Sequence, residues 1–340
     1  MNALYRQLGY SKQSYHQQVR RDGKKKVEVQ GVKKKVEETR KLYPGLGSRR
    51  IHKTAGIKEM GITRFEEFMS REGLTIQRSR KWIKTTDSRG HQHVYPNLTN
   101  GLKVLGVNEL VVGDLTYLIN SSGVYYLFLL TDVYSLRIVG WEASKEKRSC
   151  YARDALEKMI ELRGEASIQG MIHHTDRGSE YRSNAYIGRL QELGVEISMA
   201  ETCIENGYAE RINGIIKNDY LAYMDCSSLK QVRKSLEQAV SRYGDLAHKA
   251  GLKYSPIAYE TWVCSLPPDQ RPVLEMFDFG ASRLRKAQML TAERLGQPNQ
   301  IPRCPLSAKT STKLHDSNTA QDVLRPDQTT VEHNSTNKLI

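Results

Sequence analysis

The sequence predicts an α/β fold, a mixed sheet with flanking helices that follows an all-helical region. Three observations predict it. Apolar runs of strand length follow one another closely after residue 105, and the first two are joined by a Gly-containing turn. From residue 151 onwards, segments with helical periodicity alternate with further apolar runs. Before residue 77, short helical segments are separated by Gly turns. This order is typical of an α/β domain behind a helical module.

The first helices are predicted from their end signals. Ser11 is placed to cap a first helix, and a second one over residues 32–42 ends at Tyr43-Pro44-Gly45. Ser48 can cap a further helix over residues 49–54.

The last helix of this region is the best marked. Thr63 and Glu66 form a capping box, and Gly73 stands where the helix should stop. Short helices separated by Gly turns favour a helix-turn-helix, whose last helix would enter the major groove with Arg64 and Arg71 available to phosphates or bases. A helical bundle that does not bind DNA is the alternative.

Net charge is concentrated in the first quarter of the chain. Residues 1–90 hold 23 Lys and Arg against 9 Asp and Glu, a net charge of +14 that equals the charge of the whole chain. We therefore expect residues 1–95 to form a basic DNA-binding region. For the clusters at residues 24–26 and 33–35 alone, a solvated basic face or a flexible tail is the alternative.

A basic linker is expected over residues 77–100, and the second domain over residues 105–265. Its predicted strands cover residues 109–119, 124–132, 136–142, a run after Ile168, and 195–198; its predicted helices cover 151–162, 183–193, 209–223 and 229–248. Residues 266–340 are expected to be a disordered tail, apart from one basic helix over 283–294, because 297–340 is rich in Ser, Thr, Asn, Gln and Pro.

Three acidic residues stand out by their surroundings. Asp114 is the one charge inside an apolar run, Asp176 follows the exit of a short strand, and Glu210 shares a predicted helix with Lys217. Any one of them alone is more typical of a surface or capping carboxylate. Together they predict a site for a hard divalent cation such as Mg²⁺, which prefers oxygen ligands. His173 and His174 are interpreted as structural, because such ions do not call for imidazole.

Residues 108–259 resemble the integrase catalytic core of retroviral integrases and bacterial insertion-sequence transposases, an RNase H-like fold, and are closest to the insertion-sequence-three type. The resemblance is carried by Gly113-Asp114-Leu115-Thr116-Tyr117, by His174-Thr175-Asp176-Arg177-Gly178-Ser179-Glu180-Tyr181, and by Ala209-Glu210 with Lys217 seven residues on. Between Asp176 and Glu210 lie 33 residues, against about 35 in the family motif. Glu205-Asn206 replaces the usual Asp-Asn, and the usual Tyr-Asn-x-x-Arg-Pro-His is reduced to Tyr243 and His248.

The resemblance implies a DNA transposase that cleaves and joins strands at the ends of a mobile element. Asp114, Asp176 and Glu210 would be both catalytic residues and ligands of two Mg²⁺ ions, with Mn²⁺ as a substitute. Lys217 would contact a phosphate near the cut; an exposed helix lysine is the alternative. Implied partners are double-stranded DNA at element ends and target, further copies of the chain on that DNA, and a companion DNA-binding protein encoded upstream. A catalytically silent DNA-binding protein or repressor is the alternative function.

Composition agrees with a soluble globular chain, since 39% of residues are hydrophobic and 26% are charged. No apolar run approaches membrane-spanning length, the N-terminus lacks a signal-peptide core, and the five cysteines include no C-x-x-C. We therefore expect reduced thiols, a cytoplasmic location and no membrane partner, and the resemblance implies that the cytoplasm is bacterial and the chain lies at the nucleoid.

Overall fold

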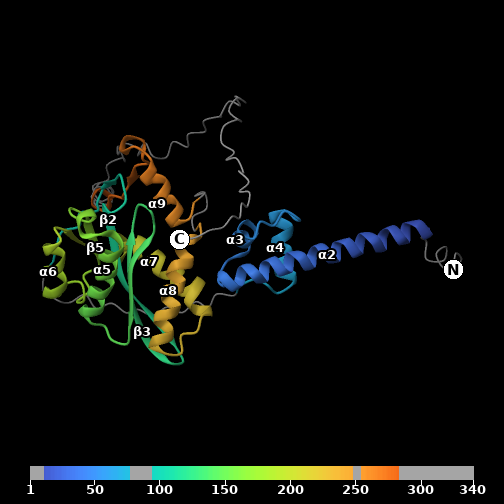
Figure 1. The fold of residues 1–340 in the computed structure, drawn as a ribbon, viewed down its shortest axis with the longest axis horizontal. Helices are drawn as coiled ribbons and strands as arrows, with labels where there is room; N and C mark the ends of the chain where they lie inside the picture. The colour runs from blue at the N-terminus through green and yellow to red at the C-terminus, as the bar shows by residue number, and fades with distance from the viewer. Residues whose placement is uncertain (1–10, 77–93, 248–253, 283–340) are drawn as a thin grey trace, which may run out of the picture. The chain divides into compact units, whose positions relative to one another are not determined.

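The structure is a computed structural model that describes residues 11–76, 94–247 and 254–282 (Figure 1). Its helices are α2 (Lys12–Leu42), α3 (Ser48–Thr54), α4 (Ile62–Arg71), α5 (Ser149–Arg163), α6 (Asn184–Glu192), α7 (Gly207–Ile215), α8 (Leu229–Asp245) and α9 (Pro256–Ser265). Its strands are β1 (Lys103–Val104), β2 (Leu110–Asn120), β3 (Gly123–Asp132), β4 (Ile138–Ser144), β5 (Ile172–Thr175), β6 (Glu196–Met199) and β7 (Leu274–Glu275). Along the described parts of the chain, no helix combines the length and apolar content that crossing a bilayer requires.

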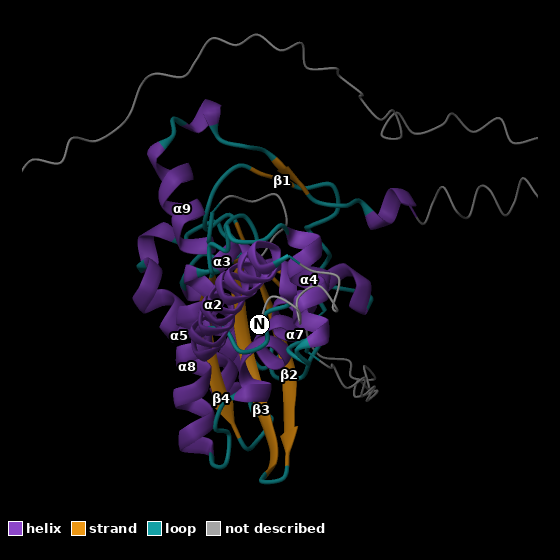
Figure 2. Cartoon of the chain, turned by 90° about the vertical axis from the view of Figure 1, so that its right-hand side faces the viewer, coloured by secondary structure: helices purple, strands orange, loops and turns teal. Residues whose placement is uncertain are grey.

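The main sheet is mixed, as predicted. Its order is β4-β3-β2-β5-β6, in which β2, β3 and β4 pair antiparallel while β5 and β6 run parallel to β2. Figure 2 shows β4, β3 and β2 side by side in this order. The hairpin between β2 and β3 turns at residues 120–123. The parallel pairing of β2 with β5 places Gly113, the residue before Asp114, opposite Thr175, the last residue of β5.

Helices cover both faces of this sheet (Figure 1). Apolar residues of α5 and α6 pack on one face, against Val111 and Leu115 of β2. The α7 region and α8 pack on the other face, against Leu127 and Leu129 of β3. Side chains alternate along a strand, so Asp114 lies on the α7 face. The sheet register thus assigns the one charge of β2 to the side of the α7 helix.

The helical region differs from prediction at its start. Ser11 caps α2 as expected, with its side chain accepting a hydrogen bond from the Ser14 amide. The division into two helices is wrong, because α2 continues as one 31-residue helix through Gly23 and Gly31. Each glycine costs a helix only about 1 kcal/mol relative to Ala. The surrounding Lys-, Glu- and Gln-rich sequence has high enough helix propensity to continue.

The next two helices begin earlier than predicted. The N-caps of α3 and α4 are Gly47 and Gly61, neither of which makes a side-chain capping bond, so the predicted caps at Ser48 and Thr63 are wrong. Gly73 does follow the end of α4, with φ of +65°. Apolar residues of α2, α3 and α4 form one core: Val32, Val36, Ile51, Phe65, Phe68 and Met69.

Segments on both sides of residues 105–265 also have contacts in the structure. Upstream, Leu98 donates its amide to Ser198 of β6, so the chain packs on the sheet before residue 105. Downstream, β7 pairs with β1, so residues 266–282 of the expected tail carry structure. The expected basic helix over 283–294, the rest of the tail and linker residues 77–93 lie outside the described residues.

Candidate active site

Asp114 lies in the middle of β2, on the face that α7 covers. The side chain of Asn213, on α7, donates a 2.7 Å hydrogen bond to Oδ2 of Asp114. One helical turn earlier on this helix, Glu210 is exposed. The carboxylate of Asp114 on β2 therefore lies inside the fold, whereas that of Glu210 on α7 lies at the surface.

Asp176 follows directly after β5, as predicted. Its Oδ1 accepts a 2.9 Å hydrogen bond from the amide of Gly178. A side chain at position 178 would lie 2.8 Å from that oxygen and 2.6 Å from Oε1 of Glu180. A Cβ at this position would therefore displace the carboxylates of Asp176 and Glu180 from their places in the loop.

The charges of Asp176 and Glu210 both act on Asp114. Burial, followed by the charge of Asp176 and then that of Glu210, raises the pKa of Asp114 from 3.8 to about 8, although the Asn213 amide opposes the change. Burial, followed by the charge of Glu180, raises the pKa of Asp176, against the amide of Gly178 and the charge of Lys147. Crowded carboxylates of this kind are stabilised by a cation between them.

A metal-binding arrangement is not formed in the described residues, since no group of three or more His, Cys, Asp or Glu side chains is placed to hold an ion. The donor chemistry nevertheless fits a hard cation, because Asp114, Asp176 and Glu210 supply carboxylate oxygens. A further oxygen, Oδ1 of Asn213, is buried beside Asp114 and has no hydrogen-bond partner.

Two asparagines connect α7 to β2. Asn206, the residue before α7, donates to the carbonyl of Gly113 at 2.9 Å, while Asn213 bonds the next residue of β2, Asp114. Both amides are 3% exposed. The sequence alone gives no signal for the role of Asn213, because Asn is common on exposed helix faces.

Lys217 is half-buried and near Asp114. Burial lowers the pKa of its amine, and the charge of Asp114 opposes that change. The prediction of one regular helix over 209–223 is wrong, since α7 ends at Ile215 and a π-helix follows over Ile216–Tyr220. Lys217 therefore belongs to the π-helix.

An ion pair next to Asp176, of which only the carboxylate is buried, was not predicted from the sequence. Glu180, with a side chain 1% exposed, pairs with Lys147 at 3.2 Å. The charge of Glu180 and its hydrogen bond raise the pKa of Lys147, although burial acts in the opposite direction. The aromatic residue next to Glu180, Tyr181, which is buried, is only a weak sign in the sequence that Glu180 is buried too. Its partner Lys147 could not be predicted, because it lies 33 residues earlier in the chain.

The remaining predicted residues lie apart from the acids or have structural roles. His173 bonds the Val111 carbonyl and the Tyr186 hydroxyl, and His174 bonds Ser198, so both act as core residues. Burial lowers the pKa of each to about 4. Arg64 and Arg71 are exposed on α4, where Arg71 lies 3.7 Å from Glu72.

Comparison with known proteins places the chain in a family. Integrase core domain families match residues 105–203 and residues 193–256. The transposase for insertion sequence element IS904 of Lactococcus lactis subsp. lactis (strain IL1403) is 32% identical over 188 residues, which are 53% of this chain and 72% of that protein. The chain belongs to the IS3-type transposases with an integrase-like core.

Other relatives of this transposase family are matched over shorter stretches. A protein of insertion sequence element IS986/IS6110 from Mycobacterium tuberculosis (strain CDC 1551 / Oshkosh) is 37% identical over 119 residues, 34% of this chain and 43% of that protein. The chain thus spans less than half the length of that relative. Among solved structures, the catalytic core domain of HTLV-2 integrase in complex with magnesium shares 23% identity over 46% of this chain and 98% of that chain, with a TM-score of 0.37.

Proposed function

We propose that this chain is a DNA transposase that performs metal-dependent strand cleavage and strand transfer at the ends of a mobile element. The observation that carries the proposal is the electrostatic coupling of Asp114 to both Asp176 and Glu210, which lie on separate elements of an integrase-like core. Such coupled carboxylates serve catalysis better than stability, because like charges repel.

Each residue would have a distinct role. Asp114, Asp176 and Glu210 would hold two Mg²⁺ ions, or Mn²⁺ in their place. When bound, these ions supply an activated water or DNA 3′-hydroxyl and stabilise the leaving oxygen. Asn213 keeps Asp114 in place through its amide. Lys217, close to the acids, would contact a phosphate beside the scissile bond.

DNA would be bound mainly by the basic region at residues 1–95, where Arg64 and Arg71 are exposed on α4. The chain would act on element ends and target DNA as an assembly of several copies, at the nucleoid in the bacterial cytoplasm. A companion DNA-binding protein encoded upstream would contribute to end recognition. A silent DNA-binding protein or repressor is the second candidate; keeping three coupled acids argues against it.

The test uses the full chain and linear DNA that carries the inverted repeats flanking its coding sequence. Asp114→Asn, Asp176→Asn and Glu210→Gln should each abolish Mg²⁺- or Mn²⁺-dependent cleavage and joining, while DNA affinity changes less than about twofold. Glu237→Gln, at an exposed position on α8, is the matched control and should keep full activity. A parent protein that binds the DNA but never cleaves it with either ion would establish the silent binder.

A further inference from the structure

The helix that carries Glu210 changes its geometry at Lys217. After α7 ends at Ile215, the next turn is a π-helix over Ile216–Tyr220, closed by the Leu221 amide, which bonds the carbonyls of Ile216 and Lys217. A π turn holds one residue more than an α turn and is frequently found at functional sites. It persists only where surrounding contacts compensate for its poorer geometry.

A loop from the helical region supplies such a contact. We call residues 43–50, between the end of α2 and the first turn of α3, the docking loop. The amide of Gly45 donates a 2.8 Å hydrogen bond to the backbone carbonyl of Asp219, inside the π-helix. A Cβ at position 45 would lie 2.5 Å from that carbonyl oxygen and 2.7 Å from its carbon. Only glycine allows this backbone-to-backbone approach.

Side chains strengthen the same junction. Arg50 lies 3.6 Å from the carboxylate of Asp219, whose side chain is only 7% exposed. Tyr43 packs against both the α8-side core, which includes Tyr220, and the core of the helical region. The docking loop therefore joins the basic region to the π-helix by a backbone bond, an ion pair and apolar packing.

We propose that the docking loop is a positioning element for Lys217. Gly45 and Arg50 hold the π-helix that keeps the half-buried Lys217 near Asp114, and they thereby couple the basic helical region to the active site. The inference rests on the proposed transposase function for its catalytic consequence. The structural part rests on the contacts of Gly45 and Arg50 with Asp219, which lies two residues after Lys217 in the same π-helix.

The physical consequence follows from helix geometry. Successive residues of an α-helix are rotated by about 100° about its axis. If the π turn relaxed to an α turn, one residue would leave the turn. Lys217, inside the turn, would rotate relative to Glu210 by part of this angle, and the residues after the turn would rotate by all of it. Lys217 would then lose its approach to Asp114 while the acids themselves stayed in place.

The main variant is Gly45→Ala, and Gly47→Ala is its matched control. Gly47 belongs to the same loop, and a Cβ there would meet nothing within 4 Å. Gly45→Ala should slow strand transfer at saturating DNA by about tenfold or more, with DNA affinity changed less than about twofold. Gly47→Ala should match the parent in both.

A double-variant cycle separates positioning from general damage. If Gly45 acts through Lys217, adding Gly45→Ala to Lys217→Ala should slow strand transfer no further. If the rate losses of the two single variants instead multiplied in the double variant, the inference would be overturned. Asp219→Asn, which keeps the backbone contact but weakens the Arg50 pair, provides a milder second variant if Gly45→Ala does not fold, and should show the same non-additivity.

A readout without catalysis keeps this inference distinct from the proposed function. Lys217 is half-buried, so an amine-acetylating reagent, followed by peptide mass spectrometry, should modify it slowly in the parent and several-fold faster in Gly45→Ala or Asp219→Asn. Lys230, exposed on α8, should react equally in all. Unchanged Lys217 modification in these variants would overturn the positioning role, even in a protein without transposase activity.

Discussion

Asp114 combines two properties that usually exclude each other, a position inside a sheet and a carboxyl group surrounded by further acids. Its only direct donor among the side chains of the described residues is the Asn213 amide. Burial and the charges of Asp176 and Glu210 raise its pKa to about 8, so it holds a proton at neutral pH when no metal is bound.

This raised pKa predicts how stability depends on pH. Between its unfolded value of 3.8 and its folded value of about 8, Asp114 is protonated in the folded chain but not in the unfolded chain. Stability in EDTA should therefore fall as pH rises from 5 to 8, by up to about 1.4 kcal/mol per pH unit. Denaturation of parent and Asp114→Asn at several pH values checks this. Parallel curves for the two would contradict it.

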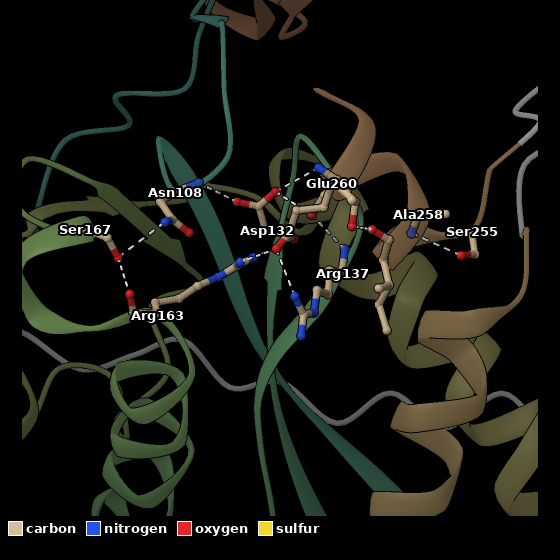
Figure 3. A network of polar contacts seen from close by, with 11 residues as sticks. Asn108, Asp132, Arg137, Arg163, Ser167, Ser255, Ala258 and Glu260 are labelled. Carbon is tan, nitrogen blue, oxygen red and sulfur yellow. Dashed lines mark hydrogen bonds and ion pairs between the residues drawn. The ribbon is translucent and has the colours of Figure 1, made fainter. Parts of the chain in front are cut away.

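Among the elements, α9 is fixed by a polar network rather than by apolar packing alone. Figure 3 shows Glu260 of α9 between two arginines, with Asp132 at the end of β3 close by. Oε1 of Glu260 accepts from Arg137 at 2.8 Å, and Arg163 of α5 bonds both carboxylate oxygens. The network therefore joins α9, α5 and the β3–β4 turn.

Removing the central carboxylate should be costly. Glu260→Ala leaves Arg163, whose side chain is 8% exposed, as a buried charge without its main partner. We expect a loss of about 3 kcal/mol in the free energy of unfolding. Urea denaturation measures it, with Glu237→Ala on α8 as the exposed control, expected within about 0.5 kcal/mol of the parent. Similar values for both variants would mean that the network adds no stability.

The elements also differ in how well their positions could be predicted from the sequence. The strands around Asp114 and Asp176 were predictable, because apolar runs and Gly turns are local signals. The metal-binding arrangement stays a prediction. The partners Asn213 and Lys147 and the π-helix at Lys217 were not predictable, since each depends on segments that meet only after folding. The starts of α3 and α4 were misplaced because a backbone N-cap at glycine leaves no side-chain signal.

At the scale of the whole molecule, charge is divided unevenly between the basic first 90 residues and a remainder that is neutral overall. Phosphate contacts release counterions, so affinity for duplex DNA should fall steeply with salt. Replacing exposed Lys24, Lys25 and Lys26 of α2 with Gln should make the plot of log affinity against log salt shallower by about 0.9 for each phosphate that the variant no longer neutralises.

A charge-matched control tests where the DNA lies. Replacing Lys103, Lys230 and Lys234, which are exposed on the core, changes the net charge by the same amount. Fluorescence anisotropy at several salt concentrations should give this variant nearly the slope of the parent. A larger change for the core variant than for the α2 variant would place the main phosphate contacts on the core.

The length of α2 has a thermal consequence. Its buried residues, Val32, Val36 and Thr39, lie towards its C-terminal end, and the partly buried Val29 packs just before them. Residues 12–27 are all exposed, so this long first part of the helix has no buried side chain. Isolated helical segments of this kind are marginal in water, and their melting is gradual. Because it exposes little apolar surface, that melting carries a small heat-capacity change. A calorimetric scan should therefore show a broad, weak heat absorption at temperatures below the sharp unfolding transition of the core. Added polyanions should suppress this broad transition and leave the sharp one unchanged.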